Sequence, residues 1–358
     1  MLNYSIHTIQ LYCRLSYAEY ISAKQNMQYL NCSMQSGKIT TKKGITKEYI
    51  IYRKLPYYGI NSIEIVNIKD DNAKINLKYA IYFTVNLYNA YAHISSPNCH
   101  IIPPDAIKSA FRSILKDITL IIKKRHLILL KLKRVDFCFD LTFNNQKCAE
   151  EYISLLKLGI PFGHLHEHKH RDNIQHRMVP YKDSLLLKCK SYEFQIYPKY
   201  LEMLNRKMEN PEEASGIVRV ELRARGKKLS RLAEKYYILS PESNIEEFLI
   251  NCPIITRKEI PQILTRMVGQ HDFYPYDTIR KKIMASKYKD SVKNKMLEIS
   301  LYLARHSTQN LLEDFGLSRS KWNSLLKKYN DLGCSPIPVP VRYSMPVYPG
   351  ICSLEQNF

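Results

Sequence analysis

Acids and arginines alternate with apolar residues in two segments of this chain, a pattern typical of β-strands with one packed face. The polar positions of residues 132–143 are Arg134, Asp136, Cys138 and Asp140, and those of residues 216–225 are Arg219, Glu221, Arg223 and Arg225. Carboxylate oxygens are the ligands that Mg²⁺ and Mn²⁺ prefer, and guanidinium groups bind phosphate with paired hydrogen bonds. If the two strands are neighbours, Asp136, Asp140 and Glu221 can hold a divalent cation. The alternative is an ordinary solvated face of mixed charge.

A tyrosine and a lysine lie where a further strand, over residues 184–197, turns into a short helix. In the sequence FQIYPKYLEM, Tyr197 and Lys199 are separated by one residue. An unperturbed tyrosine titrates near ~10, so it needs a nearby metal or cation to attack at neutral pH. The pattern therefore indicates Tyr197 as a nucleophile, with Lys199 lowering the tyrosine pKa or neutralising charge in the transition state.

A histidine-rich segment, GHLHEHKHRDNIQH, offers a competing metal site at His164 and His166. Neutral imidazoles suit divalent metals, and the two histidines flank one apolar residue. The charged residues that follow, however, are typical of a solvated loop over 163–178. A loop that is exposed or contacts DNA is favoured, and a ligand role for the histidine pair stays open as the weaker alternative.

The charge balance points to a polyanionic partner. The 358 residues include 54 Lys and Arg against 33 Asp and Glu, a net charge of +21, and nucleic acid is the leading candidate. No run of about 18 apolar residues could span a bilayer, so no membrane partner is expected. The first residues lack the order of a secretory signal, and the nine cysteines form no Cys-x-x-Cys pair, which indicates reduced thiols in a cytoplasm.

The order of elements predicts an α+β protein: a mostly antiparallel sheet with helices on one face, as in ferredoxin-like and RRM-like folds, followed by a smaller helical region. We expect residues 1–235 to form the first domain and residues 236–358 an accessory region with a break near Pro253 and Pro261 and an extended proline-rich tail. The expected strands cover 3–15, 48–54, 60–68, 73–89, 132–143, 184–197 and 216–225, and the expected helices of the first domain cover 105–124, 147–158 and 198–208.

The helical region contains two helices joined by a turn at Gly316, the second capped by Ser318 and ending at Gly333. This second helix is basic, with Arg319, Lys321, Lys327 and Lys328. It could read a DNA groove. It could equally be a packing helix with Trp322, Leu325 and Leu326 in its core, and both can hold together.

Several of these segments, in this order, resemble the replication initiators of filamentous phages (the gene II protein group) and related plasmid proteins. RVDFCFDL is similar to that family's Arg-hydrophobe-Asp strand, and FQIYPKYLEM, with Glu202, to its Tyr-x-Lys segment. ASGIVRVELRARGKKL resembles its segment ASG-hydrophobe-Val-Arg-x-Glu-x-Arg, and SRSKWNSLLKKYNDLG its C-terminal helix with a tryptophan. Two departures stand out: ISSPNCHIIPPD replaces a Gly-His-Asn-like segment, and Asn86 stands where an acid is expected.

The resemblance implies a rolling-circle initiator that nicks and rejoins one strand of a replication origin with a divalent cation, Mg²⁺ or Mn²⁺. It implies that Tyr197 forms the covalent link to the 5′ end and that Asp136 and Glu221 are the functional acids, whereas Asp140 has no counterpart. The expected partners are origin DNA, duplex and single-stranded, and the helicase and replication machinery of a bacterial host cell, in whose cytoplasm the protein would work. Phosphate contacts are expected from Arg134, Arg219, Arg223 and Arg225.

Two other functions compete with this one. A non-catalytic DNA-binding or packaging-control protein would explain the charge but not the acids among the arginines. An RNA-binding protein on a similar sheet would usually display aromatic residues on the binding face, whereas these strands display acids and arginines.

Overall fold

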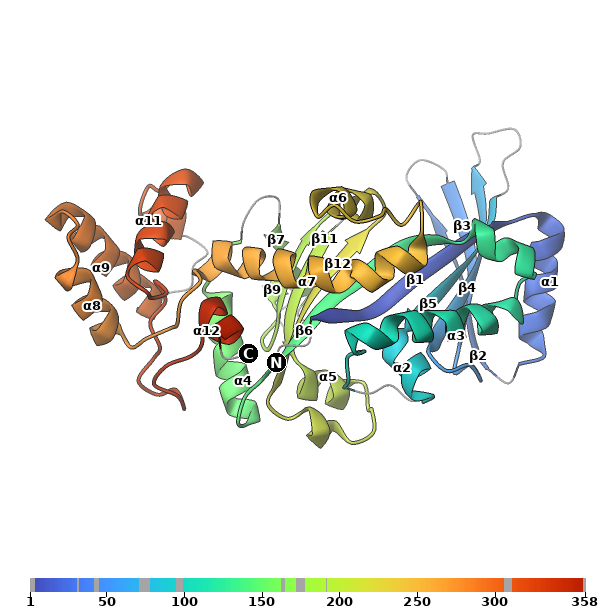
Figure 1. The fold of residues 1–358 in the computed structure, drawn as a ribbon, viewed down its shortest axis with the longest axis horizontal. Helices are drawn as coiled ribbons and strands as arrows, with labels where there is room; N and C mark the ends of the chain where they lie inside the picture. The colour runs from blue at the N-terminus through green and yellow to red at the C-terminus, as the bar shows by residue number, and fades with distance from the viewer. Residues whose placement is uncertain are drawn as a thin grey trace. The chain divides into compact units, whose positions relative to one another are not determined.

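The protein, described here by a computed structural model (Figure 1), is an α+β chain whose strands form a large antiparallel sheet. The structure describes residues 4–30, 32–41, 45–70, 78–94, 99–161, 165–171, 178–190, 192–305 and 311–356. The strands are β1 (Ser5–Leu15), β2 (Ser33–Thr40), β3 (Ile45–Arg53), β4 (Ile60–Asp70), β5 (Lys78–Asn86), β6 (Lys131–Thr142), β7 (His166–Glu167), β8 (Lys169–Arg171), β9 (Met178–Pro180), β10 (Leu185–Cys189), β11 (Tyr192–Pro198) and β12 (Ile217–Arg225). Ten of them form one sheet in the order β2-β3-β4-β5-β1-β6-β12-β11-β10-β7, while β8 pairs with β9. The predicted fold class is confirmed.

The helices are more numerous than the sequence patterns indicated. They are α1 (Tyr17–Gln28), α2 (Leu87–Ala92), α3 (Ile107–Thr119), α4 (Gln146–Lys157), α5 (Lys199–Asn205), α6 (Lys227–Lys235), α7 (Ile245–Val268), α8 (Tyr276–Ala285), α9 (Asp290–Arg305), α10 (Leu311–Asp314), α11 (Arg319–Asp331) and α12 (Ile351–Gln356), with 3-10 turns at Pro104–Ala106, Lys124–Leu129 and Pro211–Ala214. No helix among the described residues is both long and apolar enough to cross a membrane.

The chain divides into two compact units. The N-terminal unit comprises Asn3–Cys138 and Arg223–Thr256, and the C-terminal unit comprises mainly Phe139–Leu222 and Arg257–Phe358. Strands β6 and β12 and helix α7 therefore contribute residues to both units. The boundary expected near residue 235 coincides with none of the positions at which the chain passes from one unit to the other, and a separate domain over 236–358 stays a prediction.

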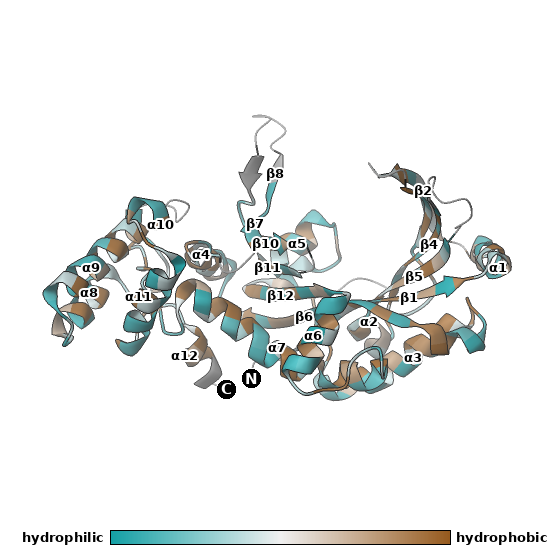
Figure 2. Ribbon diagram, turned by 90° about the horizontal axis from the view of Figure 1, so that it is seen from above, coloured by the Kyte–Doolittle hydropathy of each residue, from teal (hydrophilic) through white to brown (hydrophobic). Residues whose placement is uncertain are grey.

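In the N-terminal unit, helices cover one face of the sheet. Figure 2 shows α2 and α3 on the same side of β1 and β5. The apolar stripe expected for α3 faces inward, with Ile107, Phe111, Ile114 and Ile118 buried. Helix α1 escaped prediction because its sequence has no apolar stripe; only Ala23 and Met27 are buried. The sequence feature that indicates this helix is a capping box: the N–H of Ser16 donates to the Glu19 carboxylate, and the N–H of Glu19 donates to the Ser16 hydroxyl.

The segment over 184–197 is a hairpin, and the prediction of one strand was wrong. Leu185 pairs with Ile196 and Cys189 with Tyr192, so the chain reverses between β10 and β11. The sequence there, CKSY, contains none of the Gly, Pro or Asn-Gly signals that mark tight turns. The loop expected over 163–178 was wrong in part as well, because it carries the short strands β7 and β8; residues 172–177 lie outside the described residues.

The break expected near Pro253 and Pro261 is also wrong, because α7 runs through both prolines. Each interior proline removes one backbone hydrogen bond and costs about 3 kcal/mol. The helix nevertheless buries apolar side chains along its whole length: Phe248, Leu249, Cys252, Ile255, Ile260, Ile263, Leu264, Met267 and Val268. At ~1.5–3 kcal/mol per buried side chain, this packing outweighs the two lost bonds.

In the C-terminal unit, α8, α9 and α11 pack around a small core of Ile279, Ile283, Met296, Tyr329 and Cys334. The predicted cap of α11 is present, since the Ser318 hydroxyl accepts a hydrogen bond from the N–H of Lys321. The tail over 336–350 is irregular and is attached by bridges of Phe273 to Tyr348 and Pro275 to Val339. No helix lies within 336–350, as expected, and α12 follows this segment; turns and bends interrupt it, so it is not extended throughout.

Candidate active site

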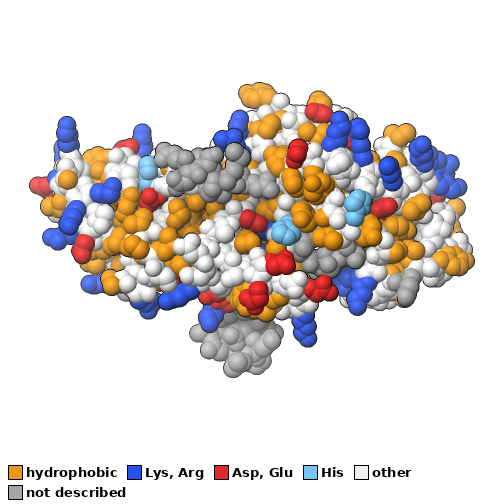
Figure 3. Space-filling view, turned by 60° about the horizontal axis from the view of Figure 1, so that its bottom comes forward, with side chains coloured by type: hydrophobic (Ala, Val, Ile, Leu, Met, Phe, Trp, Pro, Cys, Tyr) orange, Lys and Arg blue, Asp and Glu red, His pale blue; other side chains and the backbone are white. Residues whose placement is uncertain are grey.

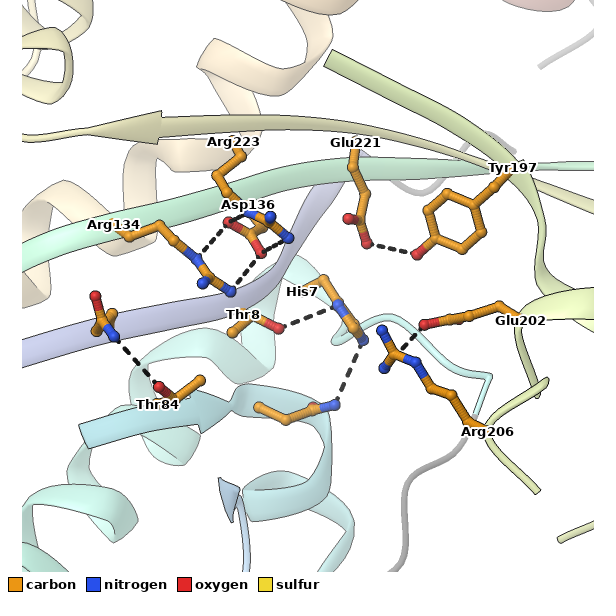
Figure 4. A network of polar contacts seen from close by, with 12 residues as sticks. His7, Thr8, Thr84, Arg134, Asp136, Tyr197, Glu202, Arg206, Glu221 and Arg223 are labelled. Carbon is orange, nitrogen blue, oxygen red and sulfur yellow. Dashed lines mark hydrogen bonds and ion pairs between the residues drawn. The ribbon is translucent and has the colours of Figure 1, made fainter. Parts of the chain in front are cut away.

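Tyr197 is the penultimate residue of β11, two residues before α5 begins, as the strand-to-helix pattern predicted. Its side chain is largely buried, and its hydroxyl donates a hydrogen bond to Oε1 of Glu221 over 2.8 Å. Glu221 projects from β12 and is 5 % exposed. Figure 4 shows the phenol ring directed at this carboxylate. Both residues belong to the C-terminal unit, so the pair is fixed within one compact body.

The surroundings hold Tyr197 in its neutral form. Burial raises the pKa of Tyr197 well above its ordinary value, the carboxylates of Glu221 and Glu202 raise it further, and Arg219 opposes them. This direction is opposite to the one expected from a neighbouring lysine. A phenol in this environment reacts only if its proton leaves during the attack, and the Glu221 carboxylate is the acceptor already in contact.

Lys199 forms an ion pair with Glu202, which lies one helical turn further along α5. Its Nζ lies 2.5 Å from Oε2 of Glu202, and it is 2 % exposed. Burial and the charge of Arg219 lower the pKa of Lys199, against the opposing effect of Glu202 and Glu221. The other oxygen of Glu202 pairs with a second cation, since Nη1 of Arg206 lies 3.0 Å from Oε1 of Glu202. Burial alone would raise the pKa of Glu202, but the charges of Lys199, Arg206 and Arg219 lower it.

A cleft of about 390 Å³ opens beside Tyr197. It is lined by Tyr181, Lys182, Asp183, Ser184, Gln195, Tyr197, Pro198, Leu201, Glu202, Asn205 and Arg206, all of the C-terminal unit. Sequence reasoning missed Arg206 and Gln195. The spacing of Glu202 and Arg206, four residues apart on a helix, was a usable signal for the first, and nothing in the sequence pointed to the second.

Arg219 and Asp140 form a buried ion pair in the same unit. The Arg219 Nε and Nη2 atoms each lie 2.7 Å from an oxygen of Asp140, and Arg219 is fully buried. A bidentate pair of this kind is among the stronger hydrogen-bonded contacts in proteins. The polar faces expected to be solvated are thus largely covered. Both carboxylate oxygens of Asp140 accept from one guanidinium.

Asp136 is held in the same way, by two arginines of the N-terminal unit. Its oxygens accept from Nε and Nη2 of Arg134 at 2.9 Å each and from the same atoms of Arg223 at 3.0 and 3.1 Å. Asp136 is 1 % exposed. Figure 4 shows the carboxylate between the two guanidinium groups. The arginines are oriented by Asp136 and are only partly exposed.

These donors do not fit a divalent cation as they stand. A cation at Asp136 or Asp140 would meet guanidinium groups that already occupy the carboxylate oxygens, and like charges repel. In neither unit, among the described residues, do three ligand atoms of His, Cys, Asp or Glu lie within 4.8 Å of one another. His164 lies outside the described residues, and His166 is exposed on β7. Asn86, in the place of an expected acid, caps α2 by accepting from the N–H of Asn89.

The backbone geometry at position 216, the glycine of the ASG segment, requires a glycine. Gly216 has φ +77°, and a Cβ built on it would lie 2.3 Å from the carbonyl oxygen of Phe143. The carbonyl of Gly216 accepts from the N–H of Phe143 over 2.9 Å. Only glycine fits this close approach, which sets the start of β12 and hence the placement of Glu221.

The basic helix α11 packs into the protein through its apolar side chains. Some of its Lys and Arg side chains are exposed, and others contact neighbouring groups. Trp322 and Leu326 are buried. Arg319 donates to the carbonyl of Pro161, and Lys328 lies over the Tyr288 ring at 5.2 Å from its centroid. Lys321 and Lys327 are exposed. On the face shown in Figure 3, Lys and Arg side chains project at many points, in keeping with the net charge of +21.

Comparison with known proteins yields similarity to solved structures alone, and that similarity is remote. No protein-family model matches the chain, and no curated protein matches it. Among solved structures, the rolling circle replication initiator protein from Geobacillus stearothermophilus is similar at 10 % sequence identity with a TM-score of 0.30, over 95 % of this chain and 99 % of that one. A similarity this low carries no argument about activity.

Proposed function

We propose that the protein is a rolling-circle replication initiator that cuts and rejoins one strand of origin DNA through Tyr197. The observation that supports this most is the hydrogen bond of the Tyr197 hydroxyl to the buried carboxylate of Glu221, at the edge of a cleft with Lys182 and Arg206 in its lining. The resemblance of the flanking segments to gene II proteins agrees with it. Origin DNA and a host helicase are the partners this function requires.

The proposed reaction is an in-line displacement at phosphorus. The phenolic oxygen of Tyr197 attacks the scissile phosphate while its proton passes to Glu221. The bond from phosphorus to the 3′ oxygen breaks, and that oxygen takes up a proton from water to leave a free 3′ hydroxyl. The 5′ phosphate stays on Tyr197 as a diester. The diester keeps the energy of the broken bond, so a 3′ hydroxyl can later reverse the attack and close the strand without a nucleotide cofactor.

Cations beside the tyrosine would hold the substrate. Arg206, 68 % exposed in its side chain, and Lys182 can each meet a phosphate at the cleft. Lys199 is buried and orients Glu202 and Arg206 rather than reaching outward. No step of this scheme uses a metal ion, because Asp136 and Asp140 are occupied by arginines.

The test uses supercoiled DNA of the protein's own replicon, with Mg²⁺, Mn²⁺ or EDTA, quenched in detergent. We expect a nicked product with protein on its 5′ end for the wild type and none for Tyr197→Phe. Tyr200→Phe is the matched control, because Tyr200 lies three residues away on α5 with its hydroxyl 3.4 Å from Glu212. Nicking by Tyr197→Phe, or its loss in Tyr200→Phe, would refute the assignment.

A non-catalytic DNA-binding protein is the second candidate. It is favoured by the burial of Tyr197 and by the raised pKa of its phenol. It predicts binding to origin DNA with neither nick nor adduct, whatever metal is present.

A further inference from the structure

Among the described residues of the N-terminal unit, the helices lie on one face of the sheet, and tyrosines and lysines form a row across the other face. Alternation puts Leu11, Cys13, Ile81 and Phe83 on the face that the helices cover, where all are fully buried. The other face carries Lys47 and Tyr49 of β3, Tyr82 of β5, Tyr12 of β1 and Lys133 of β6, which we call the tyrosine–lysine row. In Figure 2 this face of the strands is turned away from α2 and α3.

The row is a continuous series of ring and cation contacts. Tyr12 and Tyr82 are register partners on neighbouring strands, and their rings stack with centroids 5.7 Å apart at an interplanar angle of 20°. Lys133 Nζ lies 5.8 Å from the Tyr12 centroid. Lys47 Nζ lies 5.8 Å from the Tyr82 centroid and 5.6 Å from that of Tyr49. The stacked pair thus has a lysine on either side, and all three tyrosines are partly exposed.

The charge of this face is suited to an anion. Arg14 projects beside Tyr82 and is exposed. Glu64 of β4 is neutralised by Lys47, whose Nζ lies 2.5 Å from its Oε1. Asp136 is held by Arg134 and Arg223. Since both acids are paired, Arg14 and Lys133 give the face a positive surplus around the aromatic rings.

Aromatic rings with cations between them match one class of partner. Unpaired bases stack on tyrosine while lysine and arginine bind the phosphates between them, and the stacking tolerates any base. In a duplex the bases are stacked on one another and cannot stack on tyrosine, so a duplex would be attracted to this surface by its charge alone. The aromatic face whose absence from the acid-bearing strands counted against an RNA-binding protein is therefore present on the N-terminal strands.

We propose that the tyrosine–lysine row is a binding surface for single-stranded DNA, on which bases stack against Tyr12, Tyr82 and Tyr49. This rests on the proposed function only for the choice of DNA, since an initiator must hold a melted strand. Lys133 moves from the Tyr12 ring to a phosphate when bases arrive, whereas Lys47 stays paired with Glu64.

The test measures the affinity of the full-length protein for a fluorescent twelve-residue oligothymidylate, an abasic strand of equal length, and oligouridylate. All variants carry Tyr197→Phe, so that no cleavage intervenes. Tyr12→Leu with Tyr82→Leu keeps apolar bulk but removes the rings, Tyr12→Phe with Tyr82→Phe keeps stacking, and Tyr237→Leu alters an exposed tyrosine of the same unit that lies outside the row.

We expect the double leucine variant to bind oligothymidylate at least about 5-fold more weakly, which is the lower limit for the loss of one base–aromatic stack. The double phenylalanine variant and Tyr237→Leu should bind like the parent, and the abasic strand should bind equally weakly to all. Equal affinity of the leucine variant and parent, or of the abasic and thymidylate strands, would overturn the proposal, and tighter binding of oligouridylate would overturn the choice of DNA. Nicking by the wild type is assayed separately, so failure of the row and failure of Tyr197 are distinguishable.

Discussion

Replacing Asp136 by asparagine separates a structural role for this acid from a role in metal binding. The carboxylate accepts four hydrogen bonds from two guanidinium groups and its side chain is 2 % exposed. Breaking a buried ion pair by removing one partner costs about 3–5 kcal/mol. The side chains of Arg134 and Arg223 are 18 % and 26 % exposed and can recover some hydration. We therefore expect a loss near the low end, about 3 kcal/mol.

For a unit of this size, each kcal/mol shifts the Tm by about 2–4 °C, so Asp136→Asn should melt roughly 6–12 °C lower. Thermal unfolding followed by circular dichroism in EDTA measures this. Glu48→Gln is the matched control, because Glu48 belongs to the same unit, its side chain is 38 % exposed, and its nearest cations are 3.7 and 3.9 Å away. The Tm of this variant should hardly change. If Asp136→Asn were as stable as the wild type in EDTA and Mg²⁺ stabilised only the wild type, Asp136 would be a metal ligand and the ion-pair account would be refuted.

Two further predictions concern the turn before β12 and the cap of α1. Gly216→Ala should destabilise the protein by more than Gly316→Ala in urea unfolding, because both have positive φ but only the first places a Cβ 2.3 Å from a carbonyl oxygen; equal effects would contradict the turn geometry. The Glu19 pKa is lowered to about 2, first by the backbone N–H of Ser16 and then by Arg125 and the Ser16 hydroxyl. A depressed carboxyl pKa adds stability above the unfolded value near 4.5 that is lost as pH falls toward 2, so the Tm advantage of wild type over Glu19→Gln should shrink from pH 6 to pH 3, and a constant difference would rule the cap out as its source.

Local patterns predicted the elements that position the candidate site. Alternation over 132–143 and 216–225 gave β6 and β12, and the junction of strand and helix at Tyr197 lies where the sequence indicated. These features depend on neighbouring residues alone. The same holds for Ser318 at the start of α11 and for the buried Trp322 and Leu326.

Pairing across the sheet could not be predicted, because it depends on contacts distant in sequence. Asp140 and Arg219 are 79 residues apart, and alternation gives the face of each but not their contact. The sequence therefore left the acids either as ligands of a divalent cation or as part of a solvated face, whereas Asp136 and Asp140 lie against arginines. Likewise, α7 continues through Pro253 because its side chains are buried along the helix, and the residues around Pro253 do not indicate that burial.

Mass spectrometry of the trapped complex is the most direct test of the central claim. After reaction with origin DNA, nuclease digestion leaves a nucleotide on the attached residue, and trypsin, cutting after Lys190 and Lys199, yields a peptide with Tyr192 and Tyr197 but not Tyr200. The account predicts the nucleotide on this peptide, with fragmentation assigning it to Tyr197. A nucleotide on any other residue, or no modified peptide from DNA that the protein demonstrably binds, would contradict it.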